Sequence, residues 1–210
     1  LGETGHPIEI RPYEHNVATD LIEDFMLSAN EAVASEYCRR EIPFVYRVHE
    51  NPDPEKVEQV LTLIHALGMD VKKAGQEMTP GEIQEVLSKL KGKPYEDMVS
   101  RLLLRSMKRA RYTTECSGHF GLAAKYYCHF TSPIRRYPDL QIHRIIKDSI
   151  RGRLKPEKIE KYQEMLEDVA TQSSLCERRA EEAERETDKI KKAEYMSYHL
   201  EEVFEGRISG

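Results

Sequence analysis

The densest group of side chains that could do chemistry lies at residues 129–144, which read HFTSPIRRYPDLQIHR. Ser132 and Pro133 are a pair typical of a helix start, because a serine hydroxyl can cap free N–H groups and proline fits the first helical position. Arg135 and Arg136 follow within one turn. Helix-start N–H groups and planar guanidinium forks both bind phosphate oxygens. The spacing therefore predicts a phosphate-binding site.

The same two arginines have a structural alternative. Asp139 follows them closely in the sequence, and a carboxylate at that distance could pair with either guanidinium group. Spacing alone leaves both possibilities open for Arg135 and Arg136.

Four other side chains invite comparison with a zinc site: Cys116, His119, Cys128 and His129. The first two have ligand-like spacing, but Cys128 and His129 are adjacent, and adjacent ligands fit a tetrahedral site poorly. We therefore expect no zinc site here.

Aromatic and histidine side chains near the same region have two possible uses. Tyr126 and Tyr127 could stack on nucleic-acid bases, although aromatic residues beside a strand more often lie in a core. His143 is expected to be a packing residue on the helix that follows the arginines.

The elements that must position these residues are predicted to form an α+β fold that is mostly helical, with short strands. Residues 16–37 carry apolar side chains at spacings of three and four, which predicts an amphipathic helix with a buried apolar face. Capping and proline signals predict further helices at 55–67, 79–91 and 95–107.

Strands and later helices are predicted from alternation and helix-start signals. Residues 7–12 and 44–48 are strand candidates. A helix is expected from 132 to 150. Beyond Pro156 we expect two helices, because Thr171, Ser174 and Glu177 resemble a second helix start.

Composition excludes some classes of protein. Of 210 residues, 39% are apolar and 33% are charged, which is too hydrophobic for a disordered chain and too charged for a membrane protein. The start of the sequence has no signal-peptide pattern. Four irregularly spaced cysteines do not indicate a disulfide framework. We expect a cytoplasmic protein with reduced thiols.

The net charge of -5 conceals an uneven distribution. Residues 89–111 contain eight Lys/Arg and two acids, and residues 129–153 contain six and two, whereas residues 156–205 contain fifteen acids and eight bases. A basic middle can attract phosphates despite a negative total. The alternative is that these charges are only the solvated faces of helices.

Residues 129–144 closely resemble the signature of the RNB catalytic domain of the ribonuclease II / ribonuclease R family. Three other segments resemble family sequences in the same order: LIEDFMLSAN at 21–30, HFGLA at 119–123 and RRAEEAERE at 178–186. The features look closer to ribonuclease R. The resemblance covers residues 1–204 as the C-terminal part of an RNB domain, and residues 205–210 resemble the start of an OB-fold RNA-binding domain.

This resemblance implies processive 3′-to-5′ hydrolysis of single-stranded RNA to nucleoside 5′-monophosphates, with magnesium as cofactor and no membrane partner. By the same resemblance, Arg135 is the catalytic residue that holds the scissile phosphate. RNA contacts are expected at Glu23, His129, Ser132, Arg136 and Glu184.

The sequence departs from the family pattern at the metal site. The family's magnesium ligands are aspartates in a short D-x-D-D-type run, and this sequence contains no such run. We therefore expect the ligands in an upstream part of a longer enzyme and expect this fragment to be inactive alone. The alternative is a non-catalytic RNA-binding module of the same fold.

Overall fold

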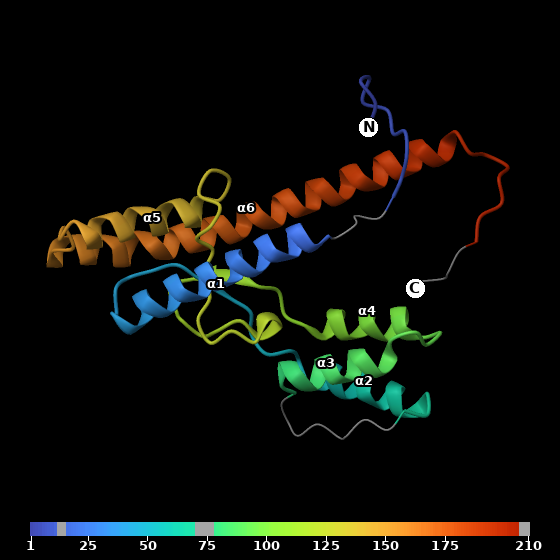
Figure 1. The fold of residues 1–210 in the computed structure, drawn as a ribbon, viewed down its shortest axis with the longest axis horizontal. Coiled ribbons are helices and arrows are strands. Elements are labelled where there is room, and N and C mark those ends of the chain that lie inside the picture. The colour runs from blue at the N-terminus through green and yellow to red at the C-terminus, as the bar shows by residue number, and fades with distance from the viewer. Residues whose placement is uncertain (12–15, 70–77, 206–210) are drawn as a thin grey trace.

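The computed structural model describes residues 1–11, 16–69 and 78–205. Helices dominate this part of the chain, and the predicted α+β class is confirmed (Figure 1). In chain order the elements are α1 (Val17–Arg39), β1 (Tyr46–Val48), α2 (Pro54–Ala66), α3 (Pro80–Leu90), α4 (Glu96–Ser106), β2 (Arg111–Thr113), the 3-10 helix η1 (Phe120–Leu122), α5 (Tyr137–Ile150) and α6 (Pro156–Ser197).

A small antiparallel sheet, β1 with β2, is the centre of the larger hydrophobic core. Arg47 is paired with Tyr112 in the register. Buried side chains from α1, α5 and the first half of α6 pack around the sheet. Helices α2, α3 and α4 enclose a second core of their own, and Figure 1 shows them as a group below the sheet. A two-stranded sheet is marginal alone, so its stability depends on these helices.

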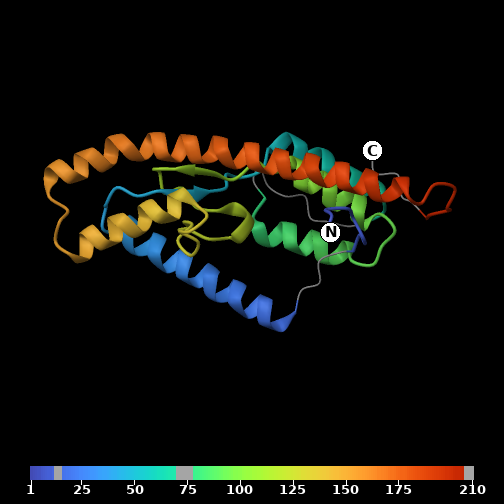
Figure 2. The ribbon, with the colours of Figure 1, turned by 90° about the horizontal axis from the view of Figure 1, so that it is seen from above.

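Helix α6 is one continuous helix of 42 residues, which corrects the prediction of two. Ser174 does not cap a new helix. Its hydroxyl donates to the Ala170 carbonyl at 2.9 Å and accepts the Tyr112 N–H at 3.0 Å. A serine that bonds back to the carbonyl four residues earlier is compatible with the interior of a helix, and Figure 2 shows the helix running along the whole molecule.

Helix α1 begins as predicted, but only half of its apolar face is buried. Asn16 caps the helix in a capping box with Thr19. Toward the C-terminal end, Ala34 and Tyr37 lie in the core. Near the start, the apolar side chains are exposed: Leu21, Ile22 and Phe25. The expectation of a fully buried face was therefore wrong for the first half.

Of the remaining predicted elements, some are confirmed and others are wrong. Helices at 55–67, 79–91 and 95–107 are confirmed to within two residues. The strand at 7–12 is wrong for 7–11, which contain no strand, and Pro12 lies outside the described residues. The expected OB-fold start at 205–210 lies almost entirely outside them. No helix in the described ranges is long and apolar enough to cross a membrane.

Candidate nucleic-acid interface

Residues 132–136 form a turn that precedes helix α5 and is not part of it. The N–H groups of Arg135 and Arg136 donate to the Ser132 carbonyl at 3.3 and 3.0 Å, and Arg136 has extended backbone angles. The helix begins at Tyr137, with Pro138 in its first turn. The predicted start at Ser132 was wrong, because a helix from Ser132 would place Pro138 beyond its first turn, where proline has no N–H to bond the carbonyl four residues earlier.

A buried carboxylate fixes this turn. Asp139 is completely buried in the first turn of α5. Its Oδ1 accepts the Ser132 N–H at 2.8 Å and a guanidinium N–H of Arg136, also at 2.8 Å. The Arg136 side chain is itself only 16% exposed. Arg136 thus neutralises Asp139, which is the structural alternative left open by the sequence.

Arg135 is not paired with Asp139, which leaves it the phosphate-binding role that the sequence analysis considered for these arginines. Its side chain is exposed, and it forms no hydrogen bond or ion pair within the described ranges of the chain. Ile134 beside it is fully exposed as well, so the two residues form the tip of the turn. The turn holds the Arg135 guanidinium group in solvent, where it can meet a phosphate.

His129 lies behind the turn in a group of rings. The Tyr112 hydroxyl is 2.8 Å from His129 Nδ1. Burial, followed by the charge of Arg136, lowers the pKa of His129 to about 3, so the ring is neutral at physiological pH. Burial also raises the pKa of Tyr112 to about 12. The tyrosine therefore keeps its proton, and the contact joins two neutral groups whose donor and acceptor roles depend on the tautomer of His129.

Tyr112 also borders a pocket of about 520 Å³ between β2 and α6. The Arg47 guanidinium group lies 4.7 Å from the centre of the Tyr112 ring and pairs with Glu177 at 2.6 Å. Arginine side chains line much of this pocket: Arg47, Arg109, Arg111 and Arg178. Two of these arginines are already paired with acids: Arg47 with Glu177, and Arg111 with Glu50. Glu177 and Glu181 line the pocket too, so arginines and acids share its wall.

Asn30 connects helix α1 to the ring group. It is completely buried. Its Oδ1 accepts the Phe130 N–H at 3.0 Å, its Nδ2 donates to the Tyr127 hydroxyl at 3.2 Å, and its carbonyl accepts the Cys128 thiol at 3.3 Å. The side chain and the backbone carbonyl of Asn30 thus hold residues 127–130, the extended segment that leads into the turn.

The residues compared with a zinc site have other partners. Cys128 bonds Asn30 and His129 bonds Tyr112, as described above. The His119 ring packs edge-on against Tyr127. No group of three or more potential metal ligands occurs among the residues that the structure describes.

The aromatic and histidine predictions are resolved by burial. Tyr127 is buried in the main core and is not open to a base, whereas Tyr126 is only partly buried. The His143 ring stacks on Phe130 at 4.4 Å and bonds its carbonyl at 2.9 Å. The packing role expected for His143 is confirmed.

The two predicted glutamates lie apart from the turn. Glu23 is exposed on α1, and Glu184 is exposed on α6. Neither forms a hydrogen bond or ion pair with residues 129–136 in the described part of the chain. Their proposed RNA contacts remain predictions.

Sequence reasoning missed three members of the site: Arg47, Tyr112 and Glu177. A signal existed for Arg47, because alternation along β1 puts it on the face opposite Tyr46 and Val48. Glu177 was considered only as a helix-start residue. Its partnership with Arg47 joins residues 130 positions apart, and no local pattern encodes such a pairing.

Comparison with known proteins identifies the family to which this fold and site belong. The RNB domain matches residues 1–152, so the chain belongs to the RNB domain family. It is 43% identical over 209 residues to "Ribonuclease R 1" of Lactococcus lactis, covering 100% of this chain and 26% of that protein.

Solved structures show the same relationship. "Mycoplasma genitalium RNase R in complex with ribose methylated single-stranded RNA" is 29% identical with a TM-score of 0.92, covering 100% of this chain and 33% of that one. "Structure of yeast Ssd1, a pseudonuclease" is 25% identical with a TM-score of 0.59, covering 77% and 21%. The chain thus spans about a fifth to a third of the length of these proteins.

The buried ion pair generates a stability prediction. Arg136→Ala leaves the Asp139 charge buried without its partner, and we expect it to lower the free energy of unfolding by about 3–5 kcal/mol. Urea denaturation measures the change. Arg135→Ala is the matched control, and its effect should be within about 0.5 kcal/mol because the side chain is exposed. Equal effects of the two substitutions would contradict the assignment.

Proposed function

We propose that this chain is part of a 3′-to-5′ exoribonuclease that hydrolyses single-stranded RNA processively to nucleoside 5′-monophosphates, with Arg135 holding the scissile phosphate. The observation that carries the proposal is the contrast between the two arginines: Arg136 is bound to buried Asp139, whereas Arg135 is exposed on the same turn. Family membership and the relatives named ribonuclease R support it. So does the neighbour described in complex with single-stranded RNA.

In this mechanism, Arg135 stabilises negative charge that develops on the phosphoryl oxygens. A guanidinium fork presents paired donors to two oxygens and keeps its charge at any relevant pH. Donors fixed in advance are effective, because they need not reorganise when charge develops. The hydrogen bonds from Ser132 and Arg136 to Asp139 fix the backbone of the turn that carries Arg135.

The surrounding residues have supporting roles in the proposal. Neutral His129, held by Tyr112 at Nδ1, has its Nε2 left to donate or accept a hydrogen bond. The arginines of the 520 Å³ pocket attract further phosphates of the same strand. Glu23, Glu184 and the Ser132 hydroxyl are proposed contacts to RNA groups that donate or accept hydrogen bonds.

Magnesium belongs to the proposal as a cofactor of the complete enzyme. Phosphoryl hydrolysis with two metal ions needs several converging carboxylates to activate water and to stabilise the leaving oxygen. The described residues contain no group of three or more side chains that could hold a metal, so they do not fit this requirement by themselves. We propose that aspartates elsewhere in a longer protein provide it, and no step is assigned to the metal here.

Binding of single-stranded RNA by the chain should be weak and salt-dependent. Each phosphate neutralised on a single strand contributes about 0.7 to the slope of log affinity against log salt. We expect Arg135→Ala to reduce the magnitude of the slope by about that amount, and Arg135→Lys to retain it. Fluorescence anisotropy with a labelled oligonucleotide at several salt concentrations measures the slope.

A matched control for this titration removes one positive charge elsewhere. Lys192 is exposed on α6 and pairs with Asp188, so Lys192→Ala should leave the slope unchanged. Affinity that does not respond to salt would rule out phosphate contacts by this chain.

The catalytic role of Arg135 is testable in the longer enzyme that the proposal requires. Arg135→Ala should lower single-turnover hydrolysis by roughly 100- to 1,000-fold, about 3–4 kcal/mol, with a smaller effect on RNA affinity. Arg135→Lys should recover only part of the rate, because a point charge replaces a fork. A normal rate combined with a lowered melting temperature would show that Arg135 is structural.

A second candidate function is a non-catalytic RNA-binding module. The similarity to yeast Ssd1, a pseudonuclease, favours it, because that protein shares the fold. The 210-residue chain should in either case show no magnesium-dependent degradation of labelled RNA. Stepwise shortening from the 3′ end that copurifies with the chain would contradict this, and activity of the longer protein separates enzyme from module.

A further inference from the structure

Three histidine rings lie in one row between the end of β1 and the segment that leads into the turn. The His49 ring is edge-on to His119, with 5.1 Å between the ring centres, and His119 is edge-on to Tyr127 at 5.2 Å. Tyr127 is edge-on to His129 at 5.8 Å, and Tyr112 lies 5.5 Å from His129. We call His49, His119, Tyr127 and His129 the histidine row. Its contacts join β1 to the segment that carries the turn.

Two ring nitrogens of the histidine row are buried without a hydrogen-bond partner among the described residues: Nε2 of His49 and Nδ1 of His119. His49 Nδ1 accepts the Gly121 N–H at 3.0 Å, so it carries no proton in this arrangement. A charged imidazole has a proton on both nitrogens. Charging His49 would therefore set two N–H groups against each other, and charging His119 would bury a donor that has no acceptor. Both changes are costly in a partly buried site.

Positive charges face the histidine row from β1 and from the turn. The Arg47 N–H donates to the Tyr127 carbonyl at 2.9 Å, which fixes this arginine beside the row. The charges of Arg136 and Arg135 act on His129 from the turn. A further proton in the row would therefore add to positive charge that is already there, and like charges disfavour the charged form of a histidine.

Burial and these charges lower the pKa of two members of the row. Burial has the largest effect on His119, followed by the charges of His49 and Arg47, and its pKa falls from 6.5 to about 4. Burial and then the charge of Arg136 lower the pKa of His129 to about 3. Both rings are therefore neutral in the folded protein at physiological pH, in agreement with their packing.

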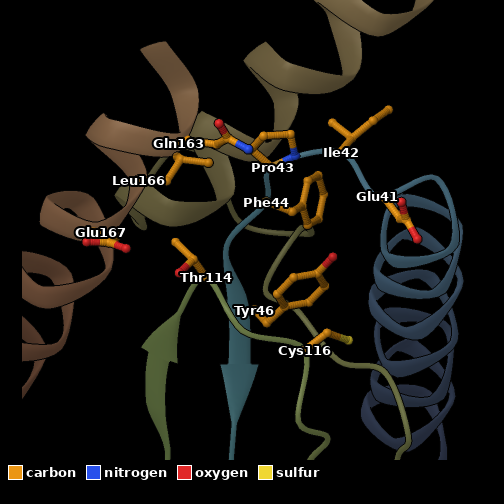
Figure 3. Close-up of a pocket in the computed structure, with 10 residues that line it drawn as sticks. All are labelled: Glu41, Ile42, Pro43, Phe44, Tyr46, Thr114, Cys116, Gln163, Leu166 and Glu167. Atoms are coloured by element: carbon orange, nitrogen blue, oxygen red, sulfur yellow. The ribbon is translucent and has the colours of Figure 1, made fainter. Parts of the chain in front are cut away.

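Carboxylates on the elements around the row do not supply it with a free negative charge. They have a cationic partner or are exposed: Asp139 of α5 with Arg136, Glu177 of α6 with Arg47, Glu50 with Lys108 and Arg111, and exposed Glu31 of α1. Glu41 and Glu167 line a separate pocket of about 310 Å³ together with Tyr46 (Figure 3). That pocket lies on the other face of β1, because Tyr46 and Arg47 alternate along the strand. Burial raises the pKa of the remaining titratable groups and keeps them neutral: Tyr112, Tyr127 and Cys128.

We propose that the histidine row is an acid-sensitive switch that holds residues 129–136 in place while its rings are neutral and releases them when the rings gain protons. In the released segment the rings are in water, where histidine has its ordinary pKa of about 6.5. The released state thus binds more protons than the packed state, so acid favours it. Release also moves Arg135, which lies on the same turn. Only this last consequence, the loss of phosphate binding in acid, rests on the proposed function.

The sign of the pH dependence follows from the lowered pKa of His119 and His129. The stabilisation that the neutral rings provide is present above the ordinary pKa of 6.5 and is lost as the pH falls toward about 4 and about 3. With two rings that gain protons on unfolding, the equilibrium constant for unfolding should rise by roughly 10- to 60-fold between about pH 6 and about pH 5. Urea denaturation of the 210-residue chain at each pH measures this rise.

Three substitutions test whether the row is responsible. His119→Gln and His129→Gln each remove one titrating ring, and each should reduce the rise by up to about eightfold. His199→Gln is the matched control. Its ring pairs with Glu202 beyond the end of α6, so this substitution should not lessen the rise. Unchanged pH dependence in both row variants would overturn the proposal.

Two measurements on the unsubstituted chain decide the matter even where a variant does not fold. NMR titration of the ring protons should show that His119 and His129 stay neutral in the folded protein down to about pH 5. Hydrogen exchange, corrected for its intrinsic dependence on pH, should show the bonded amides of Phe130 and Ser132 opening at a higher pH than those of α2–α4.

The proposal is overturned if both rings titrate near their ordinary pKa in the folded chain, or if helices α2–α4 open before the amides of Phe130 and Ser132. Neither measurement involves RNA. A chain that shows the acid-induced release but does not bind RNA would therefore count against the proposed function alone.

Discussion

The ion pair between Arg136 and Asp139 is the interaction on which the candidate site depends. A fully buried carboxylate is costly unless its charge is neutralised and its oxygens accept hydrogen bonds. Asp139 obtains the neutralising charge of Arg136 and two hydrogen bonds to its Oδ1 from the turn that precedes its own helix, while its buried Oδ2 has no hydrogen-bond partner among the described residues. A change in the shape of the turn would therefore leave the buried charge without its partners. The exposure of Arg135 is therefore a consequence of how Asp139 is satisfied, and the phosphate-binding geometry follows from the packing of the core.

Tyr112 connects the segment before the turn to the sheet and to α6. Its hydroxyl holds His129, its ring lies against Arg47, and its N–H is bonded by Ser174 of α6. A strand of three residues has few ladder hydrogen bonds of its own, so contacts of this kind supplement its pairing with β1. Tyr112 thus joins the two strands, the long helix and the segment that leads into the turn, and Arg47 and Tyr112 in the adjoining pocket are both held by partners.

Local signals explain most of what the sequence could predict. The capping box at Thr79, the helix of residues 16–37 and the resemblance of residues 129–144 all depend on neighbours within a few positions. The predictions failed where contacts with residues distant in the sequence determine the structure. In the sequence Ser174 resembles a helix cap, but in the structure its hydroxyl accepts the Tyr112 N–H. The first half of α1 has an apolar pattern without a partner to cover it, and Arg136 could be separated from Arg135 only by knowing that Asp139 is buried.

The length of α6 has a mechanical consequence. Its buried side chains all lie before Thr171, so the helix is held at one end, near Ser174. The far end lies about 35 Å beyond that point, at 1.5 Å per residue. There Glu194 pairs with His6, and Lys191 bonds the Gly5 carbonyl. At that distance, a tilt of about 5° beside Tyr112 would displace the far end of the helix, together with the N-terminal residues bonded to it, by about 3 Å.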